Sequence, residues 1–181
     1  MHQGSIQSGT QAVDLKQCKQ QIIQQSGDKN GLDRSPTQAQ QISELINELE
    51  TKGQLEDIKL TGTQWRLVCT SSTASSSGKI GPFIGRVFQV FPQDRPGQYI
   101  NKVDFGLVKA DLLASYKQPA RDRIDVAFEY INWQLGPLQF KQDISQGRPD
   151  TSGGFWKLSY TDEDFRVLYT NKGNVFVLVR E

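Results

Sequence analysis

The chain has 181 residues, a length that fits one domain able to enclose a hydrophobic core without metals or disulfides. Its 21 Lys and Arg side chains nearly balance its 20 Asp and Glu side chains, so no strong electrostatic field attracts nucleic acid or an anionic membrane surface. The longest apolar run, at 175–179, is far shorter than the ~20 residues that a transmembrane helix needs. The sequence therefore predicts a single-domain protein that is soluble or peripheral to a membrane.

The first segment, 1–10, has neither the apolar centre of a secretory signal nor the Arg-rich character of a transit peptide, and we expect a disordered start there. The Gln-rich segment that follows, 11–25, carries apolar side chains every three to four residues and predicts an amphipathic helix ending before Gly27. These side chains are Val13, Leu15, Cys18, Ile22 and Ile23. The two cysteines, Cys18 and Cys69, lie far apart without metal-ligand spacing, so we expect two buried thiols.

A second helix is predicted over 36–52. Ser35 can cap it, Pro36 suits its first turn, and Gln38 completes a capping-box pattern. Gly53 is expected to end the helix in the left-handed conformation. One face carries an apolar stripe that must pack on another element, formed by Ala39, Ile42, Leu45, Ile46 and Leu49. We expect residues 11–53 to form helices that pack on the remainder of the domain.

From residue 58 to residue 181 the sequence predicts an antiparallel β-barrel. Short apolar and β-branched runs are separated by Gly, Pro, Asp and Ser clusters, which is typical of barrels and sandwiches. The expected strands are 60–70, 83–91, 99–108, 122–130, 133–141, 155–160, 165–170 and 174–180. In the third of them Tyr99, Val103, Phe105 and Leu107 are expected to share the inner face.

Two connections and the last strand need separate interpretation. Residues 111–121 contain Pro119 and favour a short turn and an extended connection equally. The Ser-rich segment 71–78 is too small and polar to pack, and we expect a mobile loop at a barrel mouth. Both faces of the strand at 175–179 are apolar, so its outer face needs a cover, for which helix 36–52 is the obvious candidate.

The residues offer little for catalysis. The only histidine is His2, in the expected disordered start, which excludes a His-based triad and a His-rich zinc site. No glycine-rich loop precedes a helix in the pattern that binds phosphate, so we expect no metal, no cofactor and no enzyme activity. Carboxylates cluster at 162–164, but their place between two short strands favours a turn over an acid–base pair. Arg166 is expected to share a face with Asp164 and to pair with one of these acids.

A barrel of eight strands is just wide enough to fill itself or to hold one small ligand. Six aromatic side chains are candidates for lining such a cavity, although each would serve equally well as ordinary core. They are Trp65, Phe105, Phe128, Trp133, Phe140 and Trp156.

Three segments resemble the plastid-lipid-associated protein, or fibrillin, family. They are Trp-Arg-Leu-Val-Cys-Thr-Ser from Trp65, Gly-Pro-Phe-Ile-Gly-Arg-Val-Phe-Gln from Gly81, and the closing run from Tyr160 to Val179. The closing run is the most specific, with Tyr-x-Asp-x-x-x-Arg followed by Gly and Val-Phe-Val-Leu, and the resemblance covers about residues 36–181. Two departures are Gly62-Thr63-Gln64-Trp65, where the family has Gly-x-Trp, and Cys69, where it commonly has Tyr.

The resemblance implies a lipocalin-like barrel of about eight strands preceded by two helices. It also implies a plastid or cyanobacterial setting, at thylakoids or plastoglobules, and binding of carotenoids, prenylquinones or other lipids. The family supplies no catalytic residues, and Asp162, Asp164 and Arg166 correspond to a polar cluster that marks it and shapes the barrel end.

Three functions stay open. The first is a non-enzymatic binding and structural protein that holds an isoprenoid or lipid in its barrel. The second is a filled barrel that acts as an interaction module for a prenyl-lipid enzyme or a lipid-droplet rim, for which exposed apolar patches would be the distinguishing feature. The third is a bilin-handling protein in which Asp162, Asp164 and Arg166 hold an open-chain tetrapyrrole.

Overall fold

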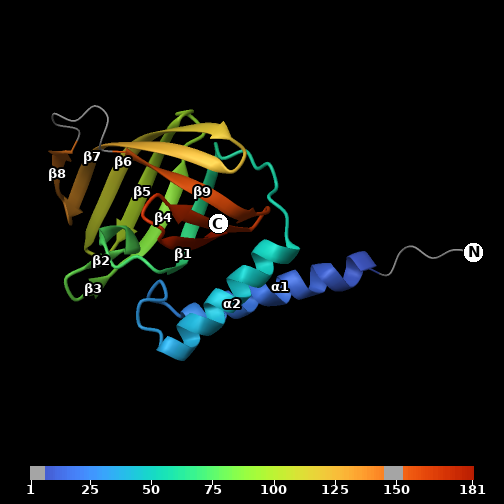
Figure 1. The fold of residues 1–181 in the computed structure, drawn as a ribbon. Coiled ribbons are helices and arrows are strands. Elements are labelled where there is room, and N and C mark those ends of the chain that lie inside the picture. Colours follow the sequence, from blue (N-terminus) through green and yellow to red (C-terminus); the bar gives the residue numbers. More distant parts are fainter. Residues whose placement is uncertain (1–6, 145–152) are drawn as a thin grey trace, which may run out of the picture.

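A computed structural model describes the backbone of residues 7–144 and 153–181, and side chains from residue 15 onward within those ranges. Eight antiparallel strands pair in a closed ring in the order β6-β5-β4-β1-β11-β10-β9-β7, and β7 pairs back to β6 (Figure 1). Their bounds are β1 Thr63–Thr70, β4 Arg86–Phe91, β5 Gln98–Asp104, β6 Val108–Ala120, β7 Arg123–Leu135, β9 Gly153–Thr161, β10 Phe165–Thr170 and β11 Val175–Arg180. The predicted fold class, an antiparallel barrel preceded by two helices, is confirmed.

The strands that close the ring differ from those predicted. Residues 111–121 contribute to the long strand β6, and β7 continues through the gap that was expected between Tyr130 and Trp133. Pro119 fits in β6 because the register with β7 shifts between Lys117 and Ala120, where the missing N–H is not needed. The strand β8, Leu138–Asp143, pairs with β7 alone and lies outside the ring. A short hairpin, β2 Lys79–Ile80 and β3 Phe83–Ile84, precedes β4.

Leu107 does not share the inner face of β5 as expected. The strand ends at Asp104, and Gly106 adopts a left-handed conformation in the turn that follows. The Asp104 carboxylate accepts a hydrogen bond from the backbone N–H of Gly106, which stabilises this turn. Leu107 is consequently 83% exposed.

Two helices, α1 Gln7–Ser26 and α2 Pro36–Lys52, pack side by side against one flank of the barrel (Figure 1). The helix α1 begins earlier than predicted, residues 1–6 lie outside the described residues, and so does the Val13 side chain. The capping box at Ser35 and Gln38 is present as predicted. No helix of the described residues is long and apolar enough to cross a membrane.

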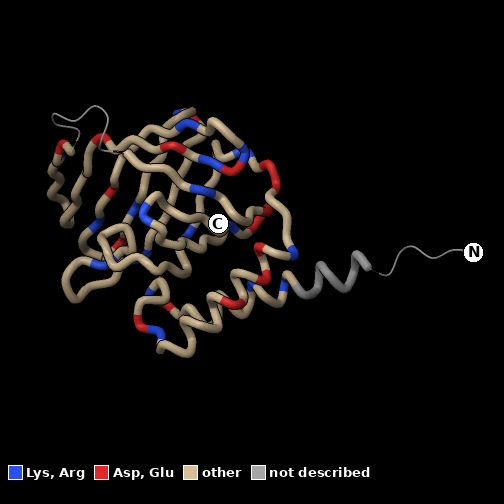
Figure 2. The backbone as a smooth tube through the Cα atoms, viewed as in Figure 1, with Lys and Arg blue, Asp and Glu red and all other residues tan. Residues whose placement is uncertain are grey.

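The helices cover the outer apolar faces of β1, β10 and β11, as the sequence of the last strand required. A buried cluster joins side chains of both helices to the barrel wall: Cys18, Ile22, Ile42, Ile46 and Leu49 from the helices, and Val68, Phe165, Val167 and Val177 from the strands. From the predicted stripes, Leu15 and Leu45 pack at its edge, whereas Ile23 is 38% exposed. Cys18 and Cys69 are both buried thiols. Along the described chain, Lys and Arg positions are interspersed with Asp and Glu positions (Figure 2).

Gly53 ends α2 for a different reason from the one predicted. Its backbone is extended, with φ of −87° and ψ of 176°, so a left-handed conformation is not what requires glycine here. The ring of Tyr160 on β9 lies so close that a Cβ at Gly53 would collide with it and with the Leu49 carbonyl oxygen. The glycine lets the chain pass from helix to barrel across the face of Tyr160.

We expect Gly53→Ala to lower the free energy of unfolding by about 1–3 kcal/mol, because the added methyl group must displace a packed aromatic ring. Urea unfolding measures the change. Thr51→Ala, in the exposed last turn of the same helix, is the matched control and should alter stability by less than about 0.5 kcal/mol. Equal effects of the two variants would contradict the steric role of Gly53.

Candidate functional site: a one-ended cavity in the barrel

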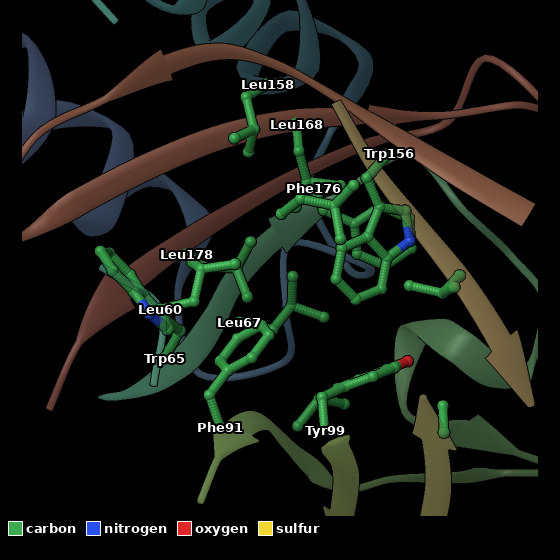
Figure 3. Close-up of a cluster of buried hydrophobic side chains, with 14 of the residues drawn as sticks. Leu60, Trp65, Leu67, Phe91, Tyr99, Trp156, Leu158, Leu168, Phe176 and Leu178 are labelled. Carbon is green, nitrogen blue, oxygen red and sulfur yellow. The ribbon is translucent and has the colours of Figure 1, made fainter. Parts of the chain in front are cut away.

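One end of the barrel is closed by the segment 53–62, which links α2 to β1. Leu60 is buried against the barrel core, and Leu55 and Ile58 pack beside it. Trp65, on the inner face of β1, donates a 2.8 Å hydrogen bond from Nε1 to the Thr63 hydroxyl. Figure 3 shows Leu60, Trp65 and Leu178 together on one side of the core, with Tyr99 and Trp156 on the other. This closed end leaves no space for a ligand around Trp65, which is fully buried.

A buried arginine lies within the closed end. Arg166 on β10 is 0% exposed, and its guanidinium carbon lies 4.4 Å from the Trp65 ring centroid and 5.6 Å from that of Phe91. Its Nη2 donates a 2.7 Å hydrogen bond to Oε1 of Gln89 on β4, while Nε and Nη1 have no partner among the described residues. Burial lowers the pKa of Arg166 to about 9, since a desolvated cation is less favourable than a hydrated one.

A cavity of about 610 Å³ occupies the barrel beyond this layer. Its walls are mainly apolar and include Leu67, Tyr99, Val103, Leu112, Val126, Phe128, Ile131, Trp133, Trp156, Leu168 and Phe176. Tyr99 and Trp156 meet edge to face with ring centroids 5.0 Å apart. Gln89, Leu67 and Leu178 also line the cavity, and Gln89 accepts the hydrogen bond from Arg166, which does not line it, so we call Gln89 the floor of the cavity. The barrel is therefore hollow at one end and filled at the other.

The six predicted aromatic candidates divide equally between lining and non-lining positions. Phe128, Trp133 and Trp156 line the cavity. Trp65 lies below its floor, and Phe105 is half-buried on the core without lining the cavity. Phe140 lies on β8, is 57% exposed, and stacks on Trp133 with ring centroids 6.3 Å apart.

Most residues that line the cavity were not among the predicted candidates, and three of these carry polar groups on the inner faces of β4 and β5: Gln89, Tyr99 and Asn101. Gln89 lies between Val87 and Phe91 in the alternation of β4, so a polar side chain in phase with two buried apolar ones was the available signal. Asn101 follows Tyr99 at the same spacing on β5. Such inward polar side chains are what a ligand with a polar group requires.

The open end of the barrel is formed by the Ser-rich loop 71–78, the turn 171–174 and the start of β9. The loop lies at the mouth as predicted, but it packs. It contains a short 3₁₀ helix, Ser75–Ser77, and both Ser72 and Ser77 are buried. The Asn30 side chain, from the connection between α1 and α2, donates 2.9 Å hydrogen bonds to the carbonyl oxygens of Ser77 and Gly85. These hydrogen bonds from the connection between α1 and α2 hold the Ser-rich loop in place, because its own small side chains pack little.

Large apolar side chains are exposed around this open end, and we call them the apolar rim: Ile80, Phe83, Leu107, Leu135, Leu138 and Phe140. They come from the β2–β3 hairpin, the β5–β6 turn and the β7–β8 hairpin, which lie at the same end of the barrel (Figure 1). The backbone N–H of Gly136 donates to the Leu107 carbonyl oxygen at 3.2 Å, joining two of these turns. Ile80 also lines the cavity.

The acidic residues at 162–164 form a turn, as expected. Oδ1 of Asp162 accepts hydrogen bonds from the backbone N–H groups of Asp164 and Phe165, at 3.1 and 2.9 Å. Asp162 also accepts from the Tyr160 hydroxyl and pairs with Lys19 of α1, which lies 2.7 Å from Asp164 as well. This acidic turn ties the first helix to the barrel.

The expected pairing of Arg166 with one of these acids is wrong. Arg166 points into the barrel, where its hydrogen-bond partner is Gln89, whereas Asp162 and Asp164 bind Lys19 outside the wall. Both faces of β10 are buried, so the side chains at 165 and 167 pack under the helices and those at 166 and 168 face the barrel interior. Because β10 begins at Phe165, Asp162 and Asp164 lie in the preceding turn and do not share the alternation that directs Arg166 into the barrel.

The charged groups of Lys19 and of the acidic turn stabilise one another. Burial of Asp162 disfavours its carboxylate, but hydrogen bonds from Lys19 and Tyr160 outweigh burial and hold the pKa of Asp162 below its usual value. Burial of Lys19 opposes its charge in the same way, and the two carboxylates overcome it and raise the pKa of Lys19. Among the described residues no group of three or more His, Cys, Asp or Glu side chains could hold a metal ion.

The family model PAP_fibrillin matches residues 16–179, which is almost the whole chain; the match begins within α1 and ends within β11. No curated protein and no solved structure matches the chain.

We expect Asp162→Asn to lower the free energy of unfolding by about 1–2 kcal/mol at pH 7, because it removes the charge that Lys19 binds. Since the folded pKa of Asp162 is lowered, its contribution is present above the unfolded pKa and is lost as pH falls through the folded pKa. Urea unfolding should therefore show a smaller difference between wild type and variant at pH 3. Asp164→Asn, whose side chain is 75% exposed, should change stability little at either pH. A difference of the same size at both pH values would contradict this role of Asp162.

Proposed function

The chain belongs to the PAP_fibrillin family, and on that premise we propose that it is a non-enzymatic protein that binds a hydrophobic small molecule in its barrel. The family is associated with plastids and with lipids in general. We place this chain at plastid or cyanobacterial lipid assemblies, such as thylakoids or plastoglobules, where prenylquinones, carotenoids and other lipids are its candidate ligands.

The cavity is the observation that supports the proposal most strongly. Its volume of about 610 Å³ falls in the range of small-molecule sites, roughly 300–1,000 Å³, and its walls are mainly apolar with a few polar groups. Burying an isoprenoid tail or acyl chain there contributes roughly 25 cal/mol for each Å² of apolar surface removed from water. A barrel whose interior was meant only as core would fill this volume with side chains.

The apolar rim suggests how such a ligand is exchanged. Monomeric soluble proteins rarely gather large apolar side chains on adjacent turns unless a partner or a lipid surface covers them. The rim is continuous with the cavity, because Ile80 belongs to both and Phe140 stacks on the cavity residue Trp133. We assign the rim to contact with a lipid surface, so that the mouth opens toward the source of its ligand.

The interaction-module alternative is favoured by the same rim if its partner is a protein rather than a lipid surface. The bilin alternative loses its support, because Arg166 lies inside the barrel and Asp162 and Asp164 lie outside it. Those three residues do not form one site.

We expect Phe128→Ala to weaken binding of a prenylquinone by about tenfold or more, since burial of a Phe side chain is worth roughly 1.5–3 kcal/mol. Tryptophan fluorescence or native mass spectrometry measures the affinity in detergent-free solution. Phe83→Ala is the matched control, because its side chain is 68% exposed and does not line the cavity. Failure of the well-folded wild type to bind prenylquinones, carotenoids or extracted lipids saturably would contradict the proposal.

Substitutions in the apolar rim, unlike those in the cavity, should weaken binding of the protein to a lipid surface. We expect Phe83→Ser combined with Leu138→Ser to reduce co-flotation with galactolipid vesicles several-fold, because two exposed apolar anchors are removed. Phe128→Ala should float as the wild type does. If the double variant still floats normally but loses a stable protein partner in a pull-down, the rim is a protein interface.

A further inference from the structure

The Arg166 guanidinium beneath the cavity has no carboxylate partner among the described residues, and this points to the class of ligand. Within the proposed function, we propose that the cavity takes a lipid with a carboxylate head, inserted head first, so that the carboxylate binds Gln89, the cavity residue that Arg166 donates to, and the tail extends to the open end. The proposal rests on the ligand-binding function and adds the class and direction of the ligand.

The first observation is electrostatic. Arg166 is fully buried, yet neither its Nε nor its Nη1 has an acceptor among the described residues, and its one hydrogen bond goes to a neutral amide. A buried charge is normally paired with an opposite charge, because desolvation is otherwise uncompensated. The Trp65 and Phe91 rings supply only partial compensation through cation–π contacts.

Among the described residues no carboxylate pairs with Arg166. Asp162 pairs with Lys19, Glu181 with Arg66, and Asp104 with Arg86. Arg166 itself hydrogen-bonds Gln89, which lines the cavity, so we infer that a ligand in the cavity supplies the counter-anion.

The second observation is the position of Gln89. Its side chain lines the cavity, and its Oε1 already accepts a hydrogen bond from Arg166, at 2.7 Å. The side-chain amide nitrogen of a glutamine has two N–H donors, and a carboxylate at the floor can accept hydrogen bonds from them. Polarisation by the cation behind it strengthens this donor, since linked hydrogen bonds reinforce one another at low dielectric.

The walls above the floor suit a tail. Leu168 and Trp156 follow the floor residues, and Phe128, Ile131 and Trp133 line the cavity toward the apolar rim. The lipid would thus bury its charged end against the closed end of the barrel and leave its tail terminus nearest the lipid surface. A purely structural Arg166, holding Trp65 in place, makes no distinction between head groups.

Binding of three ligands with one tail tests the proposal: oleic acid, oleyl alcohol and methyl oleate. We expect the wild type to prefer the acid by about tenfold or more, because a hydrogen bond to a charged group is worth about 1.5–3 kcal/mol. Gln89→Leu should reduce this preference to about twofold while the alcohol still binds. Gln89→Glu places a carboxylate beside Arg166, and we expect it to abolish the preference and to raise the midpoint of thermal unfolding.

The matched control is Gln64→Leu, the same substitution on the neighbouring strand β1 at a residue that pairs with Val90 and does not line the cavity, and it should leave the acid preference intact. Arg166 itself is not substituted, because its loss would destabilise the closed end of the barrel. In the wild type, the side-chain ¹⁵N–¹H signals of Gln89 and Arg166 should shift with oleic acid and not with the alcohol.

The outcomes separate the two proposals. Equal affinity for acid, alcohol and ester overturns the carboxylate inference and leaves the ligand-binding function standing. An acid preference that survives both Gln89 variants also overturns it, because the head is then recognised elsewhere. If none of these ligands, no prenylquinone and no carotenoid binds the folded protein, both proposals fail.

Discussion

The contact between the Arg166 guanidinium and the Trp65 ring, 4.4 Å away, divides the barrel into a closed and an open half. The Arg166 guanidinium, the Trp65 and Phe91 rings and Leu60 fill this end of the barrel with side chains from β10, β1, β4 and the segment before β1. Because a buried cation is tolerated only where its surroundings compensate for lost hydration, the side chains around Arg166 are constrained by its charge. The cavity begins where this packed layer ends.

The helices are a second consequence of the same wall. Since β10 carries Arg166 and Leu168 inward, its other side chains, Phe165 and Val167, must be covered outside. The helices supply that cover, and the acidic turn fixes them through Lys19. Both faces of this part of the barrel wall are therefore apolar. The inner face is turned toward the proposed ligand, and the outer face packs on the helices. At the open end the apolar rim is exposed among the described residues, and we assign it to contact with a lipid surface.

Local signals in the sequence predicted the parts that depend on them. The capping box at Ser35, the apolar stripe of α2 and the need to cover β11 all follow from periodicity and turn chemistry, and the structure confirms them. Local signals did not predict in the same way which strands form the closed ring. Pro119 obscured β6, because a bulge that tolerates proline is specified by the partner strand β7 and not by the residues around it.

The sequence by itself determined that the chain is an antiparallel barrel preceded by two helices and that it resembles the family to which it belongs. Only the tertiary structure decided that the barrel is hollow at one end, that Phe128, Trp133 and Trp156 line it, and that Arg166 is separated from Asp162. The physical reason is that alternation tells which side chains share a face of one strand. Which strands close the ring, and how deep in it each side chain lies, depends on register and shear between segments far apart in the chain.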